Sequence, residues 1–362
     1  MAVLVTGGAG YIGSHTCVEL LNAGEDIIVI DNFYNSKPKA IEAIKEITGR
    51  DFRFYENDCC DREALDRIFR ENFITEVIHF AGYKAVGESC VKPIMYYENN
   101  INSTLALIET MQKYGCKKLV FSSSATVYGI PDKVPVTENF PLSAINPYGS
   151  TKLMIENMCR ELYASDDQWS IILLRYFNPI GAHESGLIGE DPKGIPNNLV
   201  PYVAQVAVGK LQRVGVFGND YPTPDGTGVR DYIHVVDLAR GHVAALKWMA
   251  GEVGTGKPLG LGSLTGEAAA DGSRRGVGIF NLGTGKGSSV LDIIHAYEKA
   301  CGKTIPYEIM PRREGDIATC YAACDKAREE MGWVAEYDLE RMCVDSWRWQ
   351  SMNPDGYRGA EA

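Results

Sequence analysis

The chain has 362 residues, 45% of them hydrophobic and 23% charged, which is typical of a globular protein with one or two closely associated domains. Its 36 basic and 47 acidic residues give a formal charge of −11, and this excess argues against a broad surface for nucleic acid or anionic membrane. No apolar run approaches the roughly 18 residues of a membrane span, and an N-terminus that already reads as a strand argues against a signal peptide.

The first 31 residues predict a dinucleotide-binding unit. An apolar run, Ala2–Thr6, reads as a buried strand and leads directly into the glycine-rich turn Gly7–Gly13. A helical pattern follows as far as Gly24, and a second buried strand, Ile27–Ile30, ends on Asp31. Glycines let the backbone approach a pyrophosphate, to which the helix N-terminus offers free N–H groups and a partial positive charge. The Asp31 carboxylate can accept hydrogen bonds from a ribose and would repel a 2′-phosphate, which favours NAD over NADP.

Strands and helices continue to alternate up to about residue 176. The predicted strands are Phe52–Tyr55, Glu76–Phe80, Leu119–Phe121 and Ile171–Tyr176, and the predicted helices are Ala40–Ile47, Arg62–Glu71, Ile94–Tyr114 and Pro147–Tyr163. This alternation is typical of an α/β fold with a doubly wound parallel (Rossmann) sheet. Asp58 and Lys84 follow the carboxyl ends of predicted strands, where such sheets bind ligands. Asp58 could contact an adenine and Lys84 the phosphates or a ribose; a solvated loop carboxylate and a surface lysine are the alternatives.

The pattern changes after residue 177. Residues 177–235 are rich in Gly, Pro and Asn and predict substrate-binding loops around a short helix, Leu199–Val208. The later predicted elements are a helix over Ala239–Met249, a strand over Gly278–Gly283 and helical stretches over about 289–301 and 338–351.

We therefore expect a Rossmann domain over 1–177, to which about 230–248 returns, and a smaller mixed α/β substrate domain over 178–362. The glycine-rich stretch 251–278 predicts an exposed insertion without a chemical role. The ten cysteines and six histidines have no zinc-ligand spacing, so we expect no metal, reduced thiols and a cytoplasmic location.

A tyrosine and a lysine share one face at the start of the predicted helix 147–163. Tyr148 and Lys152 are four residues apart, which is about one helical turn. An ammonium there favours the phenolate, so we expect Lys152 to lower the Tyr148 pKa toward neutrality and make Tyr148 a general base toward a substrate hydroxyl. The spacing alone is weak evidence, because Tyr114 and Lys118 repeat it at a helix end. Position supports the first pair, since Ser124 ends a neighbouring strand and is placed to bond the same hydroxyl.

These features, in this order, resemble the UDP-glucose 4-epimerase family of the extended short-chain dehydrogenases/reductases. The matching stretches cover essentially the whole chain: Gly7–Gly13, Asp31–Asn32, His79–Gly82, Ser122–Gly129, Arg175–Pro179, Gly226–His234, Pro311–Asp316 and Trp347–Gln350. Only 251–278 is extra relative to many family members. The resemblance implies reversible interconversion of UDP-galactose and UDP-glucose in galactose metabolism, with tightly bound NAD, no net redox change and a homodimeric assembly.

The resemblance also implies residue roles. Tyr148 takes the proton of the sugar 4-hydroxyl while hydride leaves C4 for NAD, Ser124 relays or orients that proton, and Lys152 tunes Tyr148 and holds the nicotinamide ribose. The implied cofactor-binding residues are Gly7, Gly10, Tyr11, Ile12, Gly13, Asp31, Asn32, Asn35, Asp58, Phe80, Lys84, Asn99, Tyr148 and Lys152. The implied substrate-binding residues are Ser124, Tyr148, Asn178, Asn198, Phe217, Arg230, Tyr232, Arg313, Asp316 and Cys320.

Asn178, Asn198, Arg230 and Arg313 are the residues expected to hold the UDP moiety. Guanidinium forks match phosphate oxygens, although a purely structural ion pair is the alternative for either arginine. Cys320 stands where some family members carry tyrosine and others a small residue. Because a small residue leaves room for a 2-N-acetyl group, we expect some activity on UDP-N-acetylglucosamine and UDP-N-acetylgalactosamine; a buried thiol without a role is the alternative.

Two other functions share the fold. A sugar-nucleotide 4,6-dehydratase needs an acid/base pair after the serine, but this chain has Ala125 and Thr126 there. A catalytically inactive NAD sensor usually lacks the tyrosine or the lysine, and this chain has both. The apolar stripe of Ile101, Leu105 and Ile108 could belong to a helix-bundle dimer interface or to the core.

Overall fold

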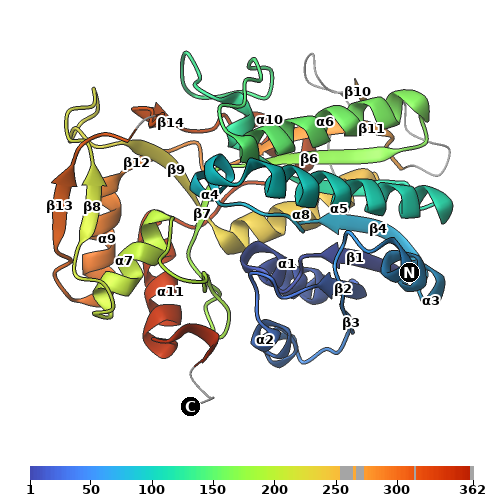
Figure 1. Cartoon of the computed structure of the whole chain (residues 1–362), viewed down its shortest axis with the longest axis horizontal. Coiled ribbons are helices and arrows are strands. Elements are labelled where there is room, and N and C mark those ends of the chain that lie inside the picture. The colour runs from blue at the N-terminus through green and yellow to red at the C-terminus, as the bar shows by residue number, and fades with distance from the viewer. Residues whose placement is uncertain (253–263, 266–272, 314, 359–362) are drawn as a thin grey trace.

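The computed structural model describes residues 1–252, 264–265, 273–313 and 315–358 (Figure 1). Its largest element is an eight-stranded sheet in the order β10-β11-β6-β5-β4-β1-β2-β3. The strands are β1 Ala2–Thr6, β2 Ile27–Asp31, β3 Arg53–Glu56, β4 Ile74–His79, β5 Lys118–Ser124, β6 Ser170–Tyr176, β10 Leu264–Thr265 and β11 Gly276–Leu282. Seven of them are parallel and β10 is antiparallel to β11, so the predicted doubly wound sheet is confirmed.

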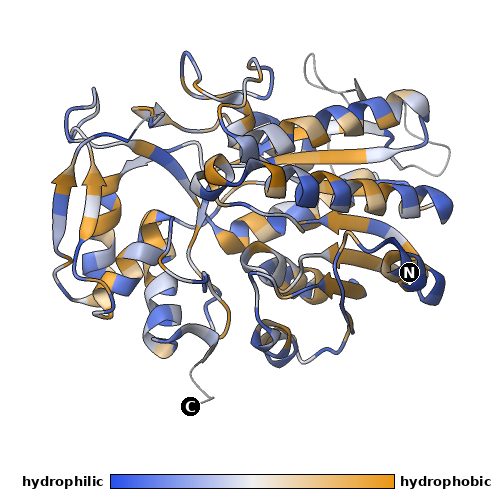
Figure 2. Cartoon of the chain, viewed as in Figure 1, coloured by the Kyte–Doolittle hydropathy of each residue, from blue (hydrophilic) through white to orange (hydrophobic). Residues whose placement is uncertain are grey.

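Helices cover both faces of this sheet (Figure 1). One face carries α1 Tyr11–Asn22, α2 Pro38–Thr48, α8 Val235–Met249 and α10 Asp325–Met331, and the other carries α3 Arg62–Glu71, α5 Pro93–Lys113 and α6 Pro147–Ser165. Two short helices, α4 Val86–Val91 and the 3₁₀ turn η1 Ala125–Tyr128, follow strands β4 and β5. Because both faces are covered, β2, β6 and β11 are buried along their whole length, and Figure 2 shows the apolar run along β6.

A second, smaller part lies beside the carboxyl ends of the large sheet (Figure 1). It contains the strands β7 Asn178–Ile180, β8 Val214–Phe217, β9 Val229–His234, β12 Gly287–Ser289, β13 Tyr307–Met310 and β14 Thr319–Cys320. Its helices are α7 Leu199–Ala207, α9 Val290–Cys301 and α11 Leu339–Met352, followed by the 3₁₀ turn η2 Gly356–Arg358. β9 is central, since it pairs with β7, β12 and β14, and the apolar sides of the three helices pack together under it.

The sequence predicted loops around one short helix over 177–235; the helix is present as α7, but the absence of strands was wrong, because β7, β8 and β9 also lie there. These strands have only three to six residues and pair with distant segments, so they carry little periodic signal. Helix α8 begins at Val235, four residues before the predicted start, where the His234 side chain accepts a hydrogen bond from the Val236 N–H. The expected insertion, 251–278, lies largely outside the described residues.

Candidate functional site

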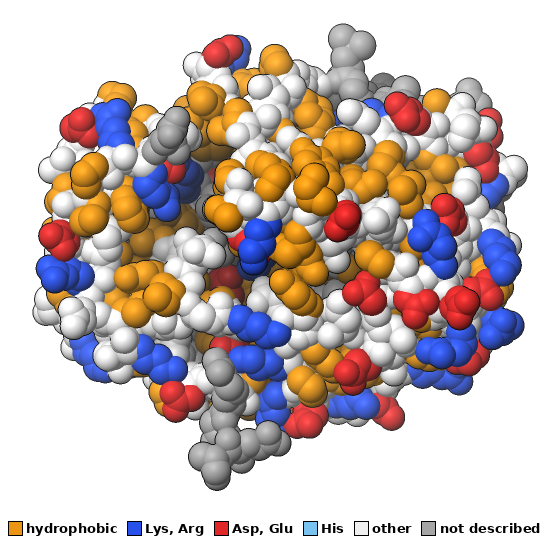
Figure 3. Space-filling view, in the orientation of Figure 1, with side chains coloured by type: hydrophobic (Ala, Val, Ile, Leu, Met, Phe, Trp, Pro, Cys, Tyr) orange, Lys and Arg blue, Asp and Glu red, His pale blue; other side chains and the backbone are white. Residues whose placement is uncertain are grey.

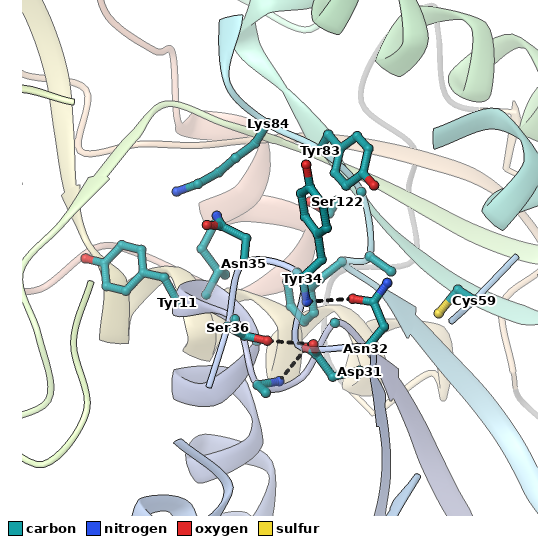
Figure 4. Close-up of a pocket in the computed structure, with 18 of the residues that line it drawn as sticks. Tyr11, Asp31, Asn32, Tyr34, Asn35, Ser36, Cys59, Tyr83, Lys84 and Ser122 are labelled. Carbon is teal, nitrogen blue, oxygen red and sulfur yellow. Dashed lines mark hydrogen bonds between the residues drawn. The ribbon is translucent and has the colours of Figure 1, made fainter. Parts of the chain in front are cut away.

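A pocket opens at the carboxyl ends of β1, β2 and β4 (Figure 4). All the residues expected to bind the cofactor line it, from the glycine turn to Tyr148 and Lys152. The structure therefore brings together predicted cofactor-binding residues that are up to 145 positions apart in the sequence, from Gly7 to Lys152. The far wall comes from residues 189–192 and Tyr357, which the sequence did not indicate.

The glycine turn presents bare backbone to this pocket. A Cβ on Gly13 would lie 2.3 Å from the carbonyl oxygen of Gly7, so only glycine allows α1 to start this close to β1. Gly10 is the N-cap of α1, and no side chain caps that helix end. The free N–H groups of the first turn and the helix dipole form a site for an anion, which fits the pyrophosphate of NAD.

Asp31 is fixed at the end of β2 and is nearly buried. Its Oδ2 accepts a hydrogen bond from the Ala9 N–H at 3.0 Å, and its Oδ1 accepts from the Phe33 N–H at 2.9 Å and the Ser36 hydroxyl at 2.6 Å (Figure 4). Asn32 donates to Asp58 at 2.8 Å, which joins the ends of β2 and β3. These oriented oxygens fit the hydroxyl groups of a ribose.

Lys84 crosses the pocket from the end of β4 toward Tyr11 (Figure 4). Its Nζ lies 5.8 Å from the Tyr11 ring centroid and 3.0 Å from Oε1 of Glu190. The same Oε1 accepts a hydrogen bond from Asn198 Nδ2 at 3.2 Å. Lys84 is thus paired with a carboxylate on the opposite wall, and its charge is available to a phosphate that competes with Glu190.

Tyr148 and Lys152 form the end of the pocket nearest β5. Both lie in the first turns of α6, whose N-cap, Asn146, accepts a hydrogen bond from the Gly149 N–H at 2.8 Å. Lys152 Nζ donates to the carbonyl oxygen of Ser122 at 2.6 Å and lies 5.8 Å from the Tyr148 ring centroid. The predicted shared helical face is confirmed.

The pKa values of this pair differ from the expectation that Lys152 lowers the pKa of Tyr148 toward neutrality. Burial raises the pKa of Tyr148 to about 12, while a side-chain interaction with Ser124 acts in the opposite direction. Burial also lowers the pKa of Lys152 to about 7. Desolvation disfavours the charged form of each group, and it is the largest influence on both pKa values.

A buried ion pair joins the elements that carry these groups. Glu156, one turn after Lys152 on α6, accepts hydrogen bonds from Arg175 Nε and Nη2 at 2.8 and 2.6 Å. It also accepts from the hydroxyl of Ser123, beside Ser124, at 2.6 Å and from Arg160 at 2.9 Å. Arg175 in turn donates to the Tyr128 hydroxyl on η1 at 2.9 Å. The network fixes β5, β6, η1 and α6 relative to one another.

The residues expected to bind the substrate gather around β9, apart from Asn198, which is the N-cap of α7, and the groups already described. Cys320 on β14 pairs with Arg230, and Asn178 on β7 pairs with Tyr232. The Arg313 guanidinium lies 4.6 Å from the Phe217 ring centroid, and both arginines pair with Asp316, at 2.9 Å from Arg313 and 4.0 Å from Arg230. The ion pair considered as the alternative is therefore present for each arginine, while the Arg313 side chain stays 55% exposed.

Asp231, next to Arg230, holds this region together. Its fully buried carboxylate accepts hydrogen bonds from the N–H groups of Thr284 at 2.8 Å, Gly285 at 3.0 Å and Ala322 at 3.0 Å. One side chain thereby joins β9 to the turn after β11 and to the segment that carries Cys320.

Sequence reasoning missed several residues of the pocket. Tyr176 ends β6 in register with Ser124, and this position at a strand end was a usable signal. Glu190, Asp191 and Tyr357 come from a distant part of the chain, and no local pattern marks them. Among the described residues, no helix is long and apolar enough to cross a membrane, and no group of His, Cys, Asp and Glu is arranged to hold a metal ion.

Comparison with known proteins gives consistent matches along the chain. The GDP-mannose 4,6 dehydratase family model matches residues 4–346. The UDP-glucose 4-epimerase of Bacillus subtilis (strain 168) is 60% identical over 361 residues, which covers 100% of both chains. The crystal structure of UDP-glucose 4-epimerase from Bifidobacterium longum in complex with NAD+ and UDP is 54% identical, with a TM-score of 0.89 over 98% of this chain and 100% of that chain. The UDP-Glc/GlcNAc 4-epimerase of Campylobacter jejuni is 35% identical, with a TM-score of 0.80 over 97% and 99% of the two chains.

Proposed function

The chain belongs to the UDP-glucose 4-epimerase family of NAD-dependent isomerases, and on this basis we propose that it interconverts UDP-galactose and UDP-glucose by transient oxidation at C4, in galactose metabolism. The observation that carries the proposal is the position of Tyr148 and Lys152 in the wall of the dinucleotide pocket, one turn apart at the start of α6. A sugar that offers its 4-hydroxyl to Tyr148 there would also have its C4 atom, the hydride donor, beside the bound cofactor.

Tyr148 is the proposed general base for the sugar 4-hydroxyl. Bound NAD supplies the hydride acceptor for C4 and, in its oxidised form, a positive charge that favours the phenolate. The N-terminus of α6 favours the phenolate as well, because Tyr148 is in the first turn of that helix. Ser124 orients the proton, and Lys152, held on the Ser122 carbonyl, binds the adjoining ribose and adds its charge when protonated. After the 4-keto sugar has turned over in the site, the proton would return to O4 and the hydride to the opposite face of C4, so no net oxidation would result.

Arg230 and Arg313 are proposed to bind the UDP diphosphate, with Asn178 and Asn198 beside it. Both guanidinium groups now share Asp316, and a diphosphate offers more oxygen acceptors than one carboxylate. Phe217 provides an aromatic face at the same place and is 37% exposed.

We further propose that the chain turns over N-acetylated UDP-sugars. Cys320 is a small side chain at the substrate region, and the Campylobacter jejuni relative is described as a UDP-Glc/GlcNAc 4-epimerase. Replacing Cys320 with tyrosine is expected to remove turnover of UDP-N-acetylglucosamine and to leave that of UDP-galactose. Absence of such turnover in the unmodified protein would refute this specificity.

A homodimer and a cytoplasmic location are part of the proposal. Exposed apolar side chains lie together over α4, α5 and α6, among them Val91 (79% exposed), Ile94 (66%) and Met154 (46%), and Figure 3 shows this apolar face. The stripe considered from the sequence lies deeper, since Ile108 is buried in the core and Ile101 packs against it. A monomer by sedimentation would refute the dimer.

The family model takes its description from dehydratases, but the loop after Ser124 does not suit that chemistry. Thr126 donates hydrogen bonds to the Ser124 hydroxyl from both its N–H, at 3.2 Å, and its own hydroxyl, at 3.0 Å. Neither Ala125 nor Thr126 provides the acid that elimination of water requires. We therefore propose epimerisation, and not dehydration, as the reaction of this chain.

The first test is to add UDP-galactose to the purified protein without NAD in solution and to follow the appearance of UDP-glucose. Product formation supports both the reaction and the retention of NAD. Tyr148→Phe should still bind NAD and UDP but lose about 10²–10⁴-fold in kcat. Full activity of this variant would refute the assigned base, and bound NAD without any product would favour a sensor or another sugar nucleotide.

A further inference from the structure

Residues 189–192 form part of the far wall of the dinucleotide pocket, and we call the short segment Gly189–Lys193 the strap. Three charged contacts tie it to the pocket's other side. Asp191 pairs with Lys37, Glu190 pairs with Lys84 at 3.0 Å, and Lys193 donates to the backbone carbonyl groups of residues 33 and 34. Residues 32–37 line the same pocket, in the loop that follows Asp31. The strap therefore closes over the part of the pocket formed by the end of β2.

Asp191 makes the most enclosed of these contacts. Its side chain is 12% exposed and that of Lys37 is 17% exposed, whereas Lys84 in the second pair is 47% exposed. Asp191 Oδ2 also accepts a hydrogen bond from the Tyr357 N–H at 3.0 Å. One carboxylate thus joins the loop after β2, the strap and the C-terminal turn η2.

The C-terminal turn is shaped to receive this carboxylate. Gly356 has φ 68°, and a Cβ there would lie 2.2 Å from Asp191 Oδ1, so the close approach requires glycine. The Tyr357 ring lies 4.7 Å from that of Trp349, and its hydroxyl accepts a hydrogen bond from the Gly189 N–H at 3.4 Å. Tyr357 itself lines the pocket.

The position of Lys37 supports a specific role for Asp191. Lys37 is the N-cap of α2, where a cation opposes the helix dipole and where no side chain caps the helix. Asp191 supplies from another part of the chain the negative charge that this helix end favours. A lysine at a helix N-terminus is locally unfavourable. Such a residue is expected where the distant partner that compensates for it has a function.

We propose that Asp191 is a positioning residue that retains NAD, because it locks the strap and the C-terminal turn over the pocket; the inference rests on the proposed function, which requires the cofactor to stay bound through each turnover. Release of NAD then requires the Lys37–Asp191–Tyr357 junction to open. The contrary expectation is purely electrostatic: a carboxylate beside a dinucleotide repels its phosphates, and removing it would then slow release.

The test compares NAD release from holoenzyme carrying Asp191→Asn, Lys37→Met or both substitutions. Holoenzyme is dialysed for timed intervals, and the NAD that remains bound is measured by chromatography. Asp191→Asn and Lys37→Met should each release NAD at least tenfold faster than the unmodified protein, and the double variant no faster than the faster single variant. Asp355→Asn is the matched control, because Asp355 pairs with Lys210 at 2.9 Å in the same C-terminal segment and its side chain is 68% exposed.

A second readout separates retention from general damage. The specific activity of the Asp191 and Lys37 variants should fall on dilution and return when NAD is added, whereas a misfolded protein would not recover. Release within twofold of the unmodified protein in both single variants, or slower release in Asp191→Asn, would overturn the inference. If the unmodified holoenzyme retains NAD but makes no product from UDP-galactose, the proposed function fails while the retention test still stands.

Discussion

Replacing Arg175 with methionine tests the buried ion pair that joins the elements of the reactive site. The Arg175 side chain is 1% exposed and that of Glu156 is 0% exposed, and two hydrogen bonds connect them. Removing one partner of a buried pair costs about 3–5 kcal/mol, because the other charge stays buried. Arg160 remains 2.9 Å from Glu156, so we expect a loss near the lower end, about 3 kcal/mol.

The loss of stability in Arg175→Met should depend on pH, and the direction of this dependence distinguishes an electrostatic effect from a loss of packing. Burial alone would raise the pKa of Glu156, but hydrogen bonds and the charge of Arg175, with Ser123 and Arg160, hold that pKa below its usual 4.5. In Arg175→Met the main opposing contribution is gone, so the folded-state pKa of Glu156 rises above its unfolded value. A carboxyl with a raised pKa destabilises the fold above that pKa and has no such effect below its unfolded pKa.

The assay is urea unfolding at fixed saturating NAD, at pH 8 and pH 5, for Arg175→Met and for the double variant Glu156→Gln/Arg175→Met. The single variant should lose more stability at pH 8 than at pH 5, by up to about 1.4 kcal/mol for each unit of pKa increase. The double variant has no carboxyl to titrate and should show no such difference. Equal losses at both pH values in the single variant would refute the charge argument and indicate lost packing alone.

Three further predictions concern the cofactor, the base and the substrate region. Gly13→Ala places a Cβ 2.3 Å from a backbone oxygen and should abolish NAD binding measured by chromatography, whereas Gly87→Ala on α4, where a Cβ meets nothing within 4 Å, should bind normally. Lys152→Met should lower kcat by about 10²-fold or more and move the rise of kcat to higher pH, because the variant lacks the charge with which Lys152, when protonated, favours the Tyr148 phenolate; an unchanged pH profile would contradict this. Asp231→Asn should raise the KM for UDP-galactose and leave NAD content unchanged, since an amide cannot accept all the N–H groups that converge there; an unchanged KM would show that this carboxylate does not shape the substrate site.

The first half of the molecule could be predicted because its signals are local. The glycine turn, the strand ending on Asp31 and the one-turn spacing of Tyr148 and Lys152 each depend on residues close together in sequence. The substrate region depends on distant pairing: β9 holds β7, β12 and β14 over segments of two to three residues, too short for a periodic pattern. Asp191 lies 154 positions from Lys37, and only the folded chain shows that they meet.

The pKa values of the reactive pair could not be predicted from spacing, and they connect catalysis to cofactor retention. The four-residue spacing places the Lys152 amine near the Tyr148 phenol. Burial, however, raises the pKa of Tyr148 to about 12 and lowers the pKa of Lys152 to about 7, so near pH 8 both groups are mainly neutral. A neutral tyrosine is a poor base, and a positive charge added to the same enclosed space favours the phenolate beyond what the start of α6 and protonated Lys152 provide. The oxidised dinucleotide carries that charge. A pocket that kept its cofactor loosely would therefore lose its base along with its hydride acceptor, which is why a strap that holds NAD in place also supports the chemistry at Tyr148.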